Sequence, residues 1–465
     1  MTTTNDSNNN NNNNTINPEH ISKVLYGEET AKALVNFTIS EMKMPRAFLW
    51  ALGEVKSAAA IANMELGLLE PDKAMAIKRA AQSVANGFYD DQFPVDVFQT
   101  GSGTSTNMNA NEVIASLVAL QSEGKISVHP LDDVNLGQSS NDVIPSCIHL
   151  SAATLIENEL LPALSHLVDT LDNKAEEHQD TIKTGRTHLM DAMPLSFGQE
   201  ISAWRDQITF IHTQLQHNLQ SLCKLAIGGT AVGTGVNTHP EFGTVVTRIL
   251  SGNSGLVFTP ADNYFHAISA QDTAVSISGN LKTTAVSLSK ISNDIRWLSS
   301  GPLNGLNEIH LPALQKGSSI MPGKVNPVIP EAVLMGCTQV MGNDTTITLA
   351  AQSGNFQLNT MLPLIGHTLI QSIQLLTTCS TSLADKAIKG MQINHAKIAQ
   401  SVARNPMLVT ALTSLIGYDK SAEIAKKAYI ENRTVLDVAK ELTNIDEAVL
   451  VERLEPRAIV GDTKM

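Results

Sequence analysis

Apolar residues recur in steps of three and four through the middle of the chain, between residues 141 and 392. Such steps keep the side chains on one face of an α-helix. The three clearest stripes are Leu160, Leu164, Leu167 and Leu171; Ile201, Trp204, Ile208, Ile211, Leu215, Leu219 and Leu222; and Ile277, Leu281, Leu288, Ile291, Ile295 and Leu298. The segments with this pattern are longer than an average helix of a globular protein, so the pattern predicts a bundle of long helices.

Shorter helical patterns flank this bundle. Residues 18–140 contain helical stretches at 47–69 and 71–86 and then a polar, glycine-rich segment. Residues 393–465 contain short amphipathic helices. We therefore expect a mainly α fold of three domains, with a mostly helical N-terminal domain, a long-helix bundle at 141–392 and a small helical C-terminal domain.

The first residues follow neither pattern. Residues 1–17 are polar and include an uninterrupted run of asparagines, so they bury too little apolar surface to offset the entropy of ordering. We predict a disordered tail. It lacks the basic and apolar regions of a secretion signal, and no segment of the chain holds 18 consecutive apolar residues.

Composition narrows the class of partner. Hydrophobic residues make up 42% and aromatic residues 4% of the chain, which suits closely packed helices, and the formal charge is −13. A strongly acidic protein attracts neither nucleic acid nor an anionic membrane, so neither partner is expected. The four cysteines are far apart in sequence and no metal-ligand set is evident, which favours a reducing, cytoplasmic location and no metal.

Five polar segments interrupt the helices, and chemistry is expected there. In the first, Ser102 and Thr104 lie beside glycines that let a ligand approach the backbone, although such residues are also common in plain turns. In the second, Ser139, Ser140 and Asn141 precede a helix. They could bind an anion at the helix start or could serve only as a helix cap.

The third and fourth segments carry weaker signals. His188 lies in a polar loop between helical stretches, where it could be a catalyst or an ordinary surface residue. Residues 228–235 are glycine-rich but lack the Lys-Ser/Thr ending of a phosphate-binding loop. We interpret them as a tight turn beside a site and not as a nucleotide site.

The fifth segment, residues 317–327, carries the strongest signal. The residues in it that could take part in catalysis or binding are Gly317, Ser318, Ser319, Gly323, Lys324 and Asn326. The glycines permit closure, the serines supply hydroxyls, and the lysine and asparagine can hold a carboxylate. A linker that merely joins two helices seldom combines these types, so the sequence predicts a mobile catalytic loop.

This loop fits the pattern G-S-x-x-M-x-x-K-x-N of the fumarase/aspartase superfamily. The chain is similar over nearly its whole length to class II fumarases within that superfamily. Residues 101–104, 139–142 and 237–241 resemble fumarases, whereas residues 311–316 depart from the usual fumarase sequence and 328–331 resemble aspartases. Aspartate ammonia-lyase and an inactive structural relative therefore stay open as alternatives.

The resemblance implies reversible hydration of fumarate to (S)-malate, by anti addition of water through a carbanion and without a cofactor. It implies a homotetramer whose sites, each for a small dicarboxylate, are shared between three subunits. The implied catalytic residues are His188, Ser318 and Glu331, and the implied substrate-binding residues are Ser102, Thr104, Ser139, Ser140, Asn141, Thr187, Ser319, Lys324 and Asn326. A secondary anion site would use His129 and Asp132, but Leu131 replaces an amide donor there.

Overall fold

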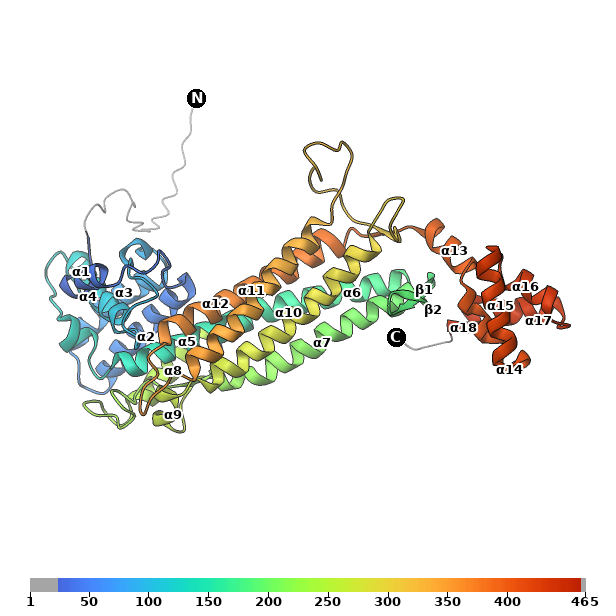
Figure 1. Cartoon of the computed structure of the whole chain (residues 1–465). Coiled ribbons are helices and arrows are strands. Elements are labelled where there is room, and N and C mark those ends of the chain that lie inside the picture. Colours follow the sequence, from blue (N-terminus) through green and yellow to red (C-terminus); the bar gives the residue numbers. More distant parts are fainter. Residues whose placement is uncertain (1–23, 461–465) are drawn as a thin grey trace, which may run out of the picture.

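The computed structural model describes residues 24–460, which form an elongated, mainly helical molecule. One group of short helices lies at one end, long helices form the middle, and a second group of short helices lies at the other end (Figure 1). The predicted disordered tail at 1–17 lies outside the described residues. Among the described helices, none has both the length and the apolar character needed to cross a bilayer.

Helices with small, buried residues build the N-terminal end. They are α1 (Glu28–Asn36), α2 (Arg46–Glu65), α3 (Pro71–Ala85) and α4 (Thr104–Gln121), with 3₁₀ turn Asp90–Gln92 and π-helical turn Pro130–Val134. Helix α2 is rich in alanine, and α3 packs closely on it because Gly53 leaves room for the α3 backbone. Helices α2 and α3 confirm the helical stretches expected at 47–69 and 71–86, except that the first stretch ends at Glu65.

Long antiparallel helices form the central bundle. They are α5 (Ser140–Leu155), continued through a π-helical turn (Ile156–Leu160) into α6 (Leu161–Glu177), then α7 (Phe197–Leu222), α10 (Asp272–Leu298), α11 (Val328–Ala351) and α12 (Leu362–Leu383), which ends in a further π-helical turn (Ala384–Ile388). Every residue of the three predicted apolar stripes is buried. The predicted bundle is therefore confirmed. Helices α8 (Phe242–Ser254) and α9 (Tyr264–Ser269) cover its N-terminal end.

The few strands are short. They are the hairpin β1 (Ile182–Thr187) with β2 (Met190–Ser196), the parallel pair β3 (Lys224–Leu225) with β4 (Thr259–Pro260), and the antiparallel pair β5 (Ile309–His310) with β6 (Gln392–Ile393). The hairpin corrects the prediction of an irregular loop around His188. Its strands lack the alternation of apolar and polar residues that marks a strand, because charged Lys183 and polar Thr184 are the buried residues of β1.

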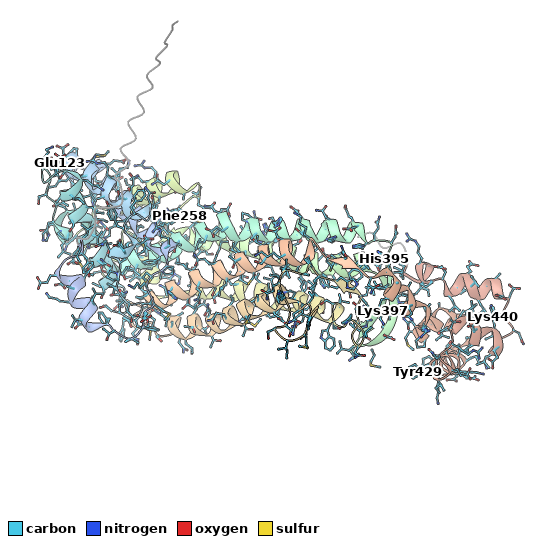
Figure 2. The ribbon with its side chains drawn as sticks, turned by 90° about the horizontal axis from the view of Figure 1, so that it is seen from above. Glu123, Phe258, His395, Lys397, Tyr429 and Lys440 are labelled. Carbon is cyan, nitrogen blue, oxygen red and sulfur yellow. The ribbon has the colours of Figure 1, made fainter. Side chains whose placement is uncertain are left out.

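The C-terminal unit has its own small core, which includes Leu412, Ile424 and Val438. Its elements are α13 (His395–Ala403), 3₁₀ turn Pro406–Leu412, α14 (Thr413–Ile416), α15 (Tyr418–Glu431), α16 (Val435–Leu442), α17 (Glu447–Leu454) and α18 (Pro456–Val460). Figure 2 shows Tyr429 and Lys440 in this unit and Glu123 at the opposite end of the molecule. One continuous core joins the N-terminal helices to the bundle, so the division into three domains stays a prediction.

Candidate active site

The first two polar segments meet where α4 and α5 begin side by side. Gly103, with φ of 76°, precedes α4, and a Cβ atom there would lie 2.8 Å from the Ile144 side chain of α5. Glycine is therefore needed both for the backbone conformation and for the close approach. Ser102 Oγ lies 2.7 Å from Thr104 Oγ1, so the two hydroxyls of the first segment form one hydrogen-bonded pair next to α5.

The start of α5 is capped by its own residues. Ser139 Oγ accepts the backbone N–H of Asn141 at 3.2 Å, and the carboxylate of Asp142 accepts the backbone N–H of Ser139 at 2.9 Å. The Asn107 amide donates to Ser140 Oγ at 3.0 Å. The cap interpretation is thus confirmed, while binding of an anion by these residues stays a prediction.

Asp142 also fixes the glycine-rich segment above this helix start. Its buried carboxylate accepts the backbone N–H groups of Gly228 at 3.0 Å and Thr230 at 2.8 Å. Burial raises the pKa of Asp142 to about 6, although hydrogen bonds from Ser139, Thr230 and Gly228 oppose the rise. The φ angles of Gly228, Thr230, Gly233 and Gly235 are positive, which confirms the predicted tight turn beside the first two segments.

His188 lies at the tip of the β1–β2 hairpin. Thr187 pairs with Met190, so the turn consists of His188 and Leu189, whose φ angles are 57° and 63°. Two-residue hairpin turns with two positive φ angles usually contain Asn-Gly, and other side chains are strained in this conformation. Both side chains are exposed. Strain at an exposed histidine is typical of a functional position.

Two cations of β1 form a cluster of ion pairs with acidic residues from other elements. Lys183 lies 2.6 Å from Glu200 and 2.9 Å from Glu308, and Arg186 also pairs with Glu308. Burial alone would raise the pKa of Glu308, but the hydrogen bond from Arg186 and the charge of Lys183 lower it overall. Because Glu308 immediately precedes β5, the cluster ties the hairpin to the segment that leads into the fifth polar segment.

The loop at 317–327 is closed by its own hydrogen bonds. The Gly317 N–H donates to the Lys324 carbonyl at 2.9 Å, and the Asn326 amide donates to the Gly317 carbonyl at 2.7 Å. Within the loop, Ser318 Oγ accepts the backbone N–H groups of Ile320 at 3.2 Å and Met321 at 3.1 Å. Two backbone donors therefore point at the hydroxyl oxygen that the sequence singled out.

A cavity of about 710 Å³ lies beside this loop. Lys324, Asn326 and Glu331 line it together with residues at the end of α10 and in β5. Lys324 and Glu331 are exposed, as is Ser319. The segment that carries the loop projects from the side of the bundle between α10 and α11 (Figure 1). A positively charged side chain, Lys324, and a negatively charged one, Glu331, are therefore exposed beside the cavity.

Within one chain, the predicted site residues form two groups that lie far from each other. Helix α7 runs from the hairpin with His188 to the turn that contacts α5, and its 26 residues span about 39 Å. Helices α4 and α5, whose starts carry Ser102, Thr104 and residues 139–141, begin at one end of the bundle. The β1–β2 hairpin and the segment between α10 and α11 lie toward the other end (Figure 1). Among the described residues, no hydrogen bond or ion pair joins His188 to Glu331.

The residues of the secondary anion site contact each other. His129 Nδ1 accepts the backbone N–H of Asp132 at 3.1 Å and lies 3.1 Å from its carboxylate. Leu131 is 48% exposed and offers only an apolar side chain. Nothing in this geometry replaces the missing amide donor, so anion binding here stays a doubtful prediction.

Comparison with known proteins identifies the family. Residues 19–342 match the lyase family and residues 408–461 match the fumarase C C-terminal family. The chain is 53% identical over 437 residues to fumarate hydratase class II 2 of Pseudomonas aeruginosa, covering 94% of this chain and 95% of that protein. It is 52% identical over 435 residues to fumarate hydratase class II of Xylella fastidiosa, covering 94% and 92%. The chain belongs to the class II fumarate hydratase family.

A solved structure supports the same family. The class II fumarase from Schistosoma mansoni superimposes with a TM-score of 0.92 and 39% sequence identity, covering 94% of this chain and 96% of that one. The resemblance of the chain to class II fumarases, seen in its sequence, is therefore confirmed.

Several residues that shape the site lie outside the family's loop motif. No sequence motif includes Lys183, Glu308 or Lys56, all of which are buried. Lys56 carried a signal, because Leu52 and Ala60, one helical turn away on either side in α2, are apolar. Glu308 carried a weaker one as an acidic residue in a segment rich in glycine and asparagine. Their partners are far away in sequence, so their roles required the structure.

Proposed function

We propose that this chain catalyses the reversible hydration of fumarate to (S)-malate, by anti addition of water through a carbanion. The reaction is a step of the tricarboxylic acid cycle. The observation that carries the proposal is the position of Ser318 Oγ, which accepts two backbone N–H groups in a closed loop beside a polar cavity. Removing a proton from carbon needs a strong base, and these donors favour the serine alkoxide.

The proton transfers follow from these positions. In the direction of malate to fumarate, Ser318 Oγ takes the carbon-bound proton, and the electron pair moves into the adjacent carboxylate. The carbon–oxygen bond then breaks, and protonated His188 gives its proton to the leaving hydroxide, which departs as water. Glu331 stabilises the charged imidazole across the assembled site. The donor and acceptor act on opposite faces, which gives anti elimination.

Two sets of donors hold the dicarboxylate. Lys324, Asn326, Thr187 and Ser319 bind the carboxylate that accepts the carbanion charge. The second set binds the rest of the substrate and consists of Ser102, Thr104, Ser139, Ser140 and Asn141. The start of α5 adds its free N–H groups and helix dipole to the second set, which favours an anion there.

Hydration in deuterated water tests the proposed chemistry. Fumarate should become malate with one deuterium at C3, placed anti to the added hydroxyl, as read from proton coupling constants by NMR. Loss of stereochemistry, or no malate at all, would contradict the mechanism. The names of the relatives at 52% and 53% identity favour water over ammonia as the group added.

We further propose a homotetramer in which each site combines segments of three subunits. The separation of about 39 Å along α7 supports it, because one dicarboxylate cannot contact both ends of a chain. Large apolar side chains on the bundle are also exposed, including Phe210 at 60%, Met335 at 70% and Leu349 at 55%. Such exposure on long helices indicates a surface that other subunits cover.

Complementation between inactive variants tests the shared site. Ser318→Ala removes the base at one end, and Asn141→Asp places a repelling carboxylate at the other. Neither variant should be active alone. Random mixed tetramers should regain about a quarter of the wild-type activity, because half of the subunits supply each intact end. No recovery in confirmed mixed tetramers would contradict the three-subunit site.

Cysteine chemistry supports a cytoplasmic location. The structure has four free cysteines, and Cys147, Cys337 and Cys379 are buried. Free thiols persist in reducing compartments, whereas secreted proteins usually oxidise them. We propose that the enzyme acts in the cytoplasm, which fractionation of the source cells would test.

A further inference from the structure

Lys56 is a charged residue in the interior of the N-terminal end. Its side chain is fully buried, and its ammonium group donates to Asn135 Oδ1 at 2.9 Å and to Gln138 Oε1 at 2.9 Å. Both acceptors are neutral amides. Burying a cation without a carboxylate bonded to it costs free energy, so an apolar residue would stabilise the fold better at this position.

A chain of hydrogen bonds leads from Lys56 to Ser140, one of the proposed substrate-binding residues. Asn135 Oδ1 also accepts from the Asn107 amide at 3.2 Å and from the Asn111 amide at 3.3 Å. The Asn107 amide donates in addition to Ser140 Oγ at 3.0 Å. One fully buried charge on α2 is thereby connected, through two amides, to a hydroxyl at the first residue of α5.

Among the described residues, no carboxylate pairs directly with the Lys56 ammonium group. Asp142 is buried on α5, but its carboxylate accepts backbone N–H groups of Ser139, Gly228 and Thr230. Burial lowers the pKa of Lys56 to about 7, while the negative charge of Asp142 opposes this shift. A negative ligand at the start of α5 would favour the ammonium form in the same way.

We propose that Lys56 is a positioning residue for the substrate carboxylate at the start of α5. Its ammonium group fixes Asn135, which orients Asn107 and hence Ser140, and its charge lies behind the N–H groups that face the carboxylate. This inference rests on the proposed dicarboxylate site. Because this chain of hydrogen bonds ends at Ser140, a proposed substrate-binding residue, Lys56 acts on binding and not on proton transfer.

The test compares Lys56→Met with wild type in the full-length, assembled enzyme. Methionine keeps most of the length of the side chain and removes the charge and the donors. The measurements are kcat and KM for malate, the inhibition constant of succinate, and the thermal midpoint. We expect KM and the succinate constant to rise together by about tenfold, with kcat changed by less than about threefold.

Glu112→Gln is the matched control. Glu112 is buried on α4, the same helix as Asn107, but it accepts hydrogen bonds from Gly27 and Thr30 at the start of α1. This substitution should lower the thermal midpoint without changing KM or the succinate constant. If Lys56→Met behaves in the same way, its role is structural and the proposal is wrong.

A second variant keeps the proposal testable if Lys56→Met does not assemble. Asn107→Ala cuts the path between Lys56 and Ser140 and leaves the charge in place. It should raise the succinate constant, and an unchanged constant would overturn the proposal. The activity of the wild type distinguishes a failure of the proposed function from a failure of the role proposed for Lys56. An inactive wild type refutes the proposed function, whereas an active wild type with insensitive variants refutes only the role of Lys56.

Discussion

The carboxylate of Asp142 accepts the backbone N–H of Thr230 at 2.8 Å, across 88 residues of sequence. This bond and the one from Gly228 hold the glycine-rich turn against the start of α5. Asp142→Asn would turn an amide donor toward one of the buried N–H groups. Leaving such a group unpaired costs about 1–3 kcal/mol. We expect a lower thermal midpoint and faster hydrogen exchange at residues 228–235, and unchanged exchange would contradict this role.

The same carboxylate predicts a pH effect on stability. Its pKa is raised from 3.8 to about 6 in the folded protein. Between these values the folded state keeps a proton that the unfolded chain releases, so this group makes stability fall as pH rises. Unfolding by denaturant from pH 4 to 6 should show this slope in wild type and less of it in Asp142→Asn. Identical slopes would refute the assignment.

Glu308 should be essential for holding the His188 hairpin. Glu308→Gln leaves Lys183 and Arg186 without their shared carboxylate, and breaking a buried ion pair costs about 3–5 kcal/mol. The pKa of Glu308 lies below 4.5, so its contribution is present above that pH and is lost as pH falls through the folded pKa. Thermal unfolding at pH 7 measures the loss.

An exposed ion pair is the control for this experiment. Glu123 lies 2.9 Å from Lys125, and both side chains are more than three-quarters exposed, at 79% and 76%. Exposed pairs contribute about 0–1 kcal/mol, so Glu123→Gln should have little effect. Similar midpoints for the two variants would mean that the buried cluster does not hold the hairpin.

The N–H groups around Ser318 can be tested without changing the serine. Ile320→Pro removes one of the two donors, whereas Ile320→Ala keeps it. Loss of one such donor costs about 10²–10³-fold in kcat. Ser318→Ala should lose several orders of magnitude with folding intact. If proline and alanine at position 320 had equal activity, the N–H of that residue would have no part in catalysis.

His188 can be replaced without disturbing its unusual backbone. Asparagine tolerates a positive φ, so His188→Asn removes the imidazole and keeps the hairpin turn. We expect a loss of roughly 10²–10⁴-fold in kcat if His188 transfers a proton. Leu189→Gly relaxes the neighbouring strained residue and serves as the control for turn geometry. A change confined to KM would assign His188 to binding.

The central bundle could be predicted from the sequence because apolar stripes at helical spacing report directly which face is buried. The stripe through Ile201, Trp204 and Ile208 illustrates this, since all three are fully buried in α7. The hairpin around His188 could not be predicted. The buried Lys183 of β1 pairs with Glu308, 125 residues away, and local composition does not report such distant partners.

The candidate site was predictable only as a set of separate segments. Local motifs drew attention to Ser318, Lys324 and His188, but sequence gave no distances between them. The structure adds the two donors to Ser318 Oγ and the separation of the two ends of the bundle. Residues such as Lys56 act through neighbours that belong to other helices, so their roles depend on tertiary packing.

The choice of substrate is the most direct test of the proposed hydration of fumarate to malate. Purified enzyme is incubated separately with (S)-malate and with aspartate, and the ultraviolet absorbance of the fumarate formed is followed, with Ser318→Ala as the matched blank. We expect rapid fumarate formation from malate, none from aspartate, and almost none from either substrate with Ser318→Ala. Fumarate from aspartate alone, or from neither substrate, would contradict the proposed reaction.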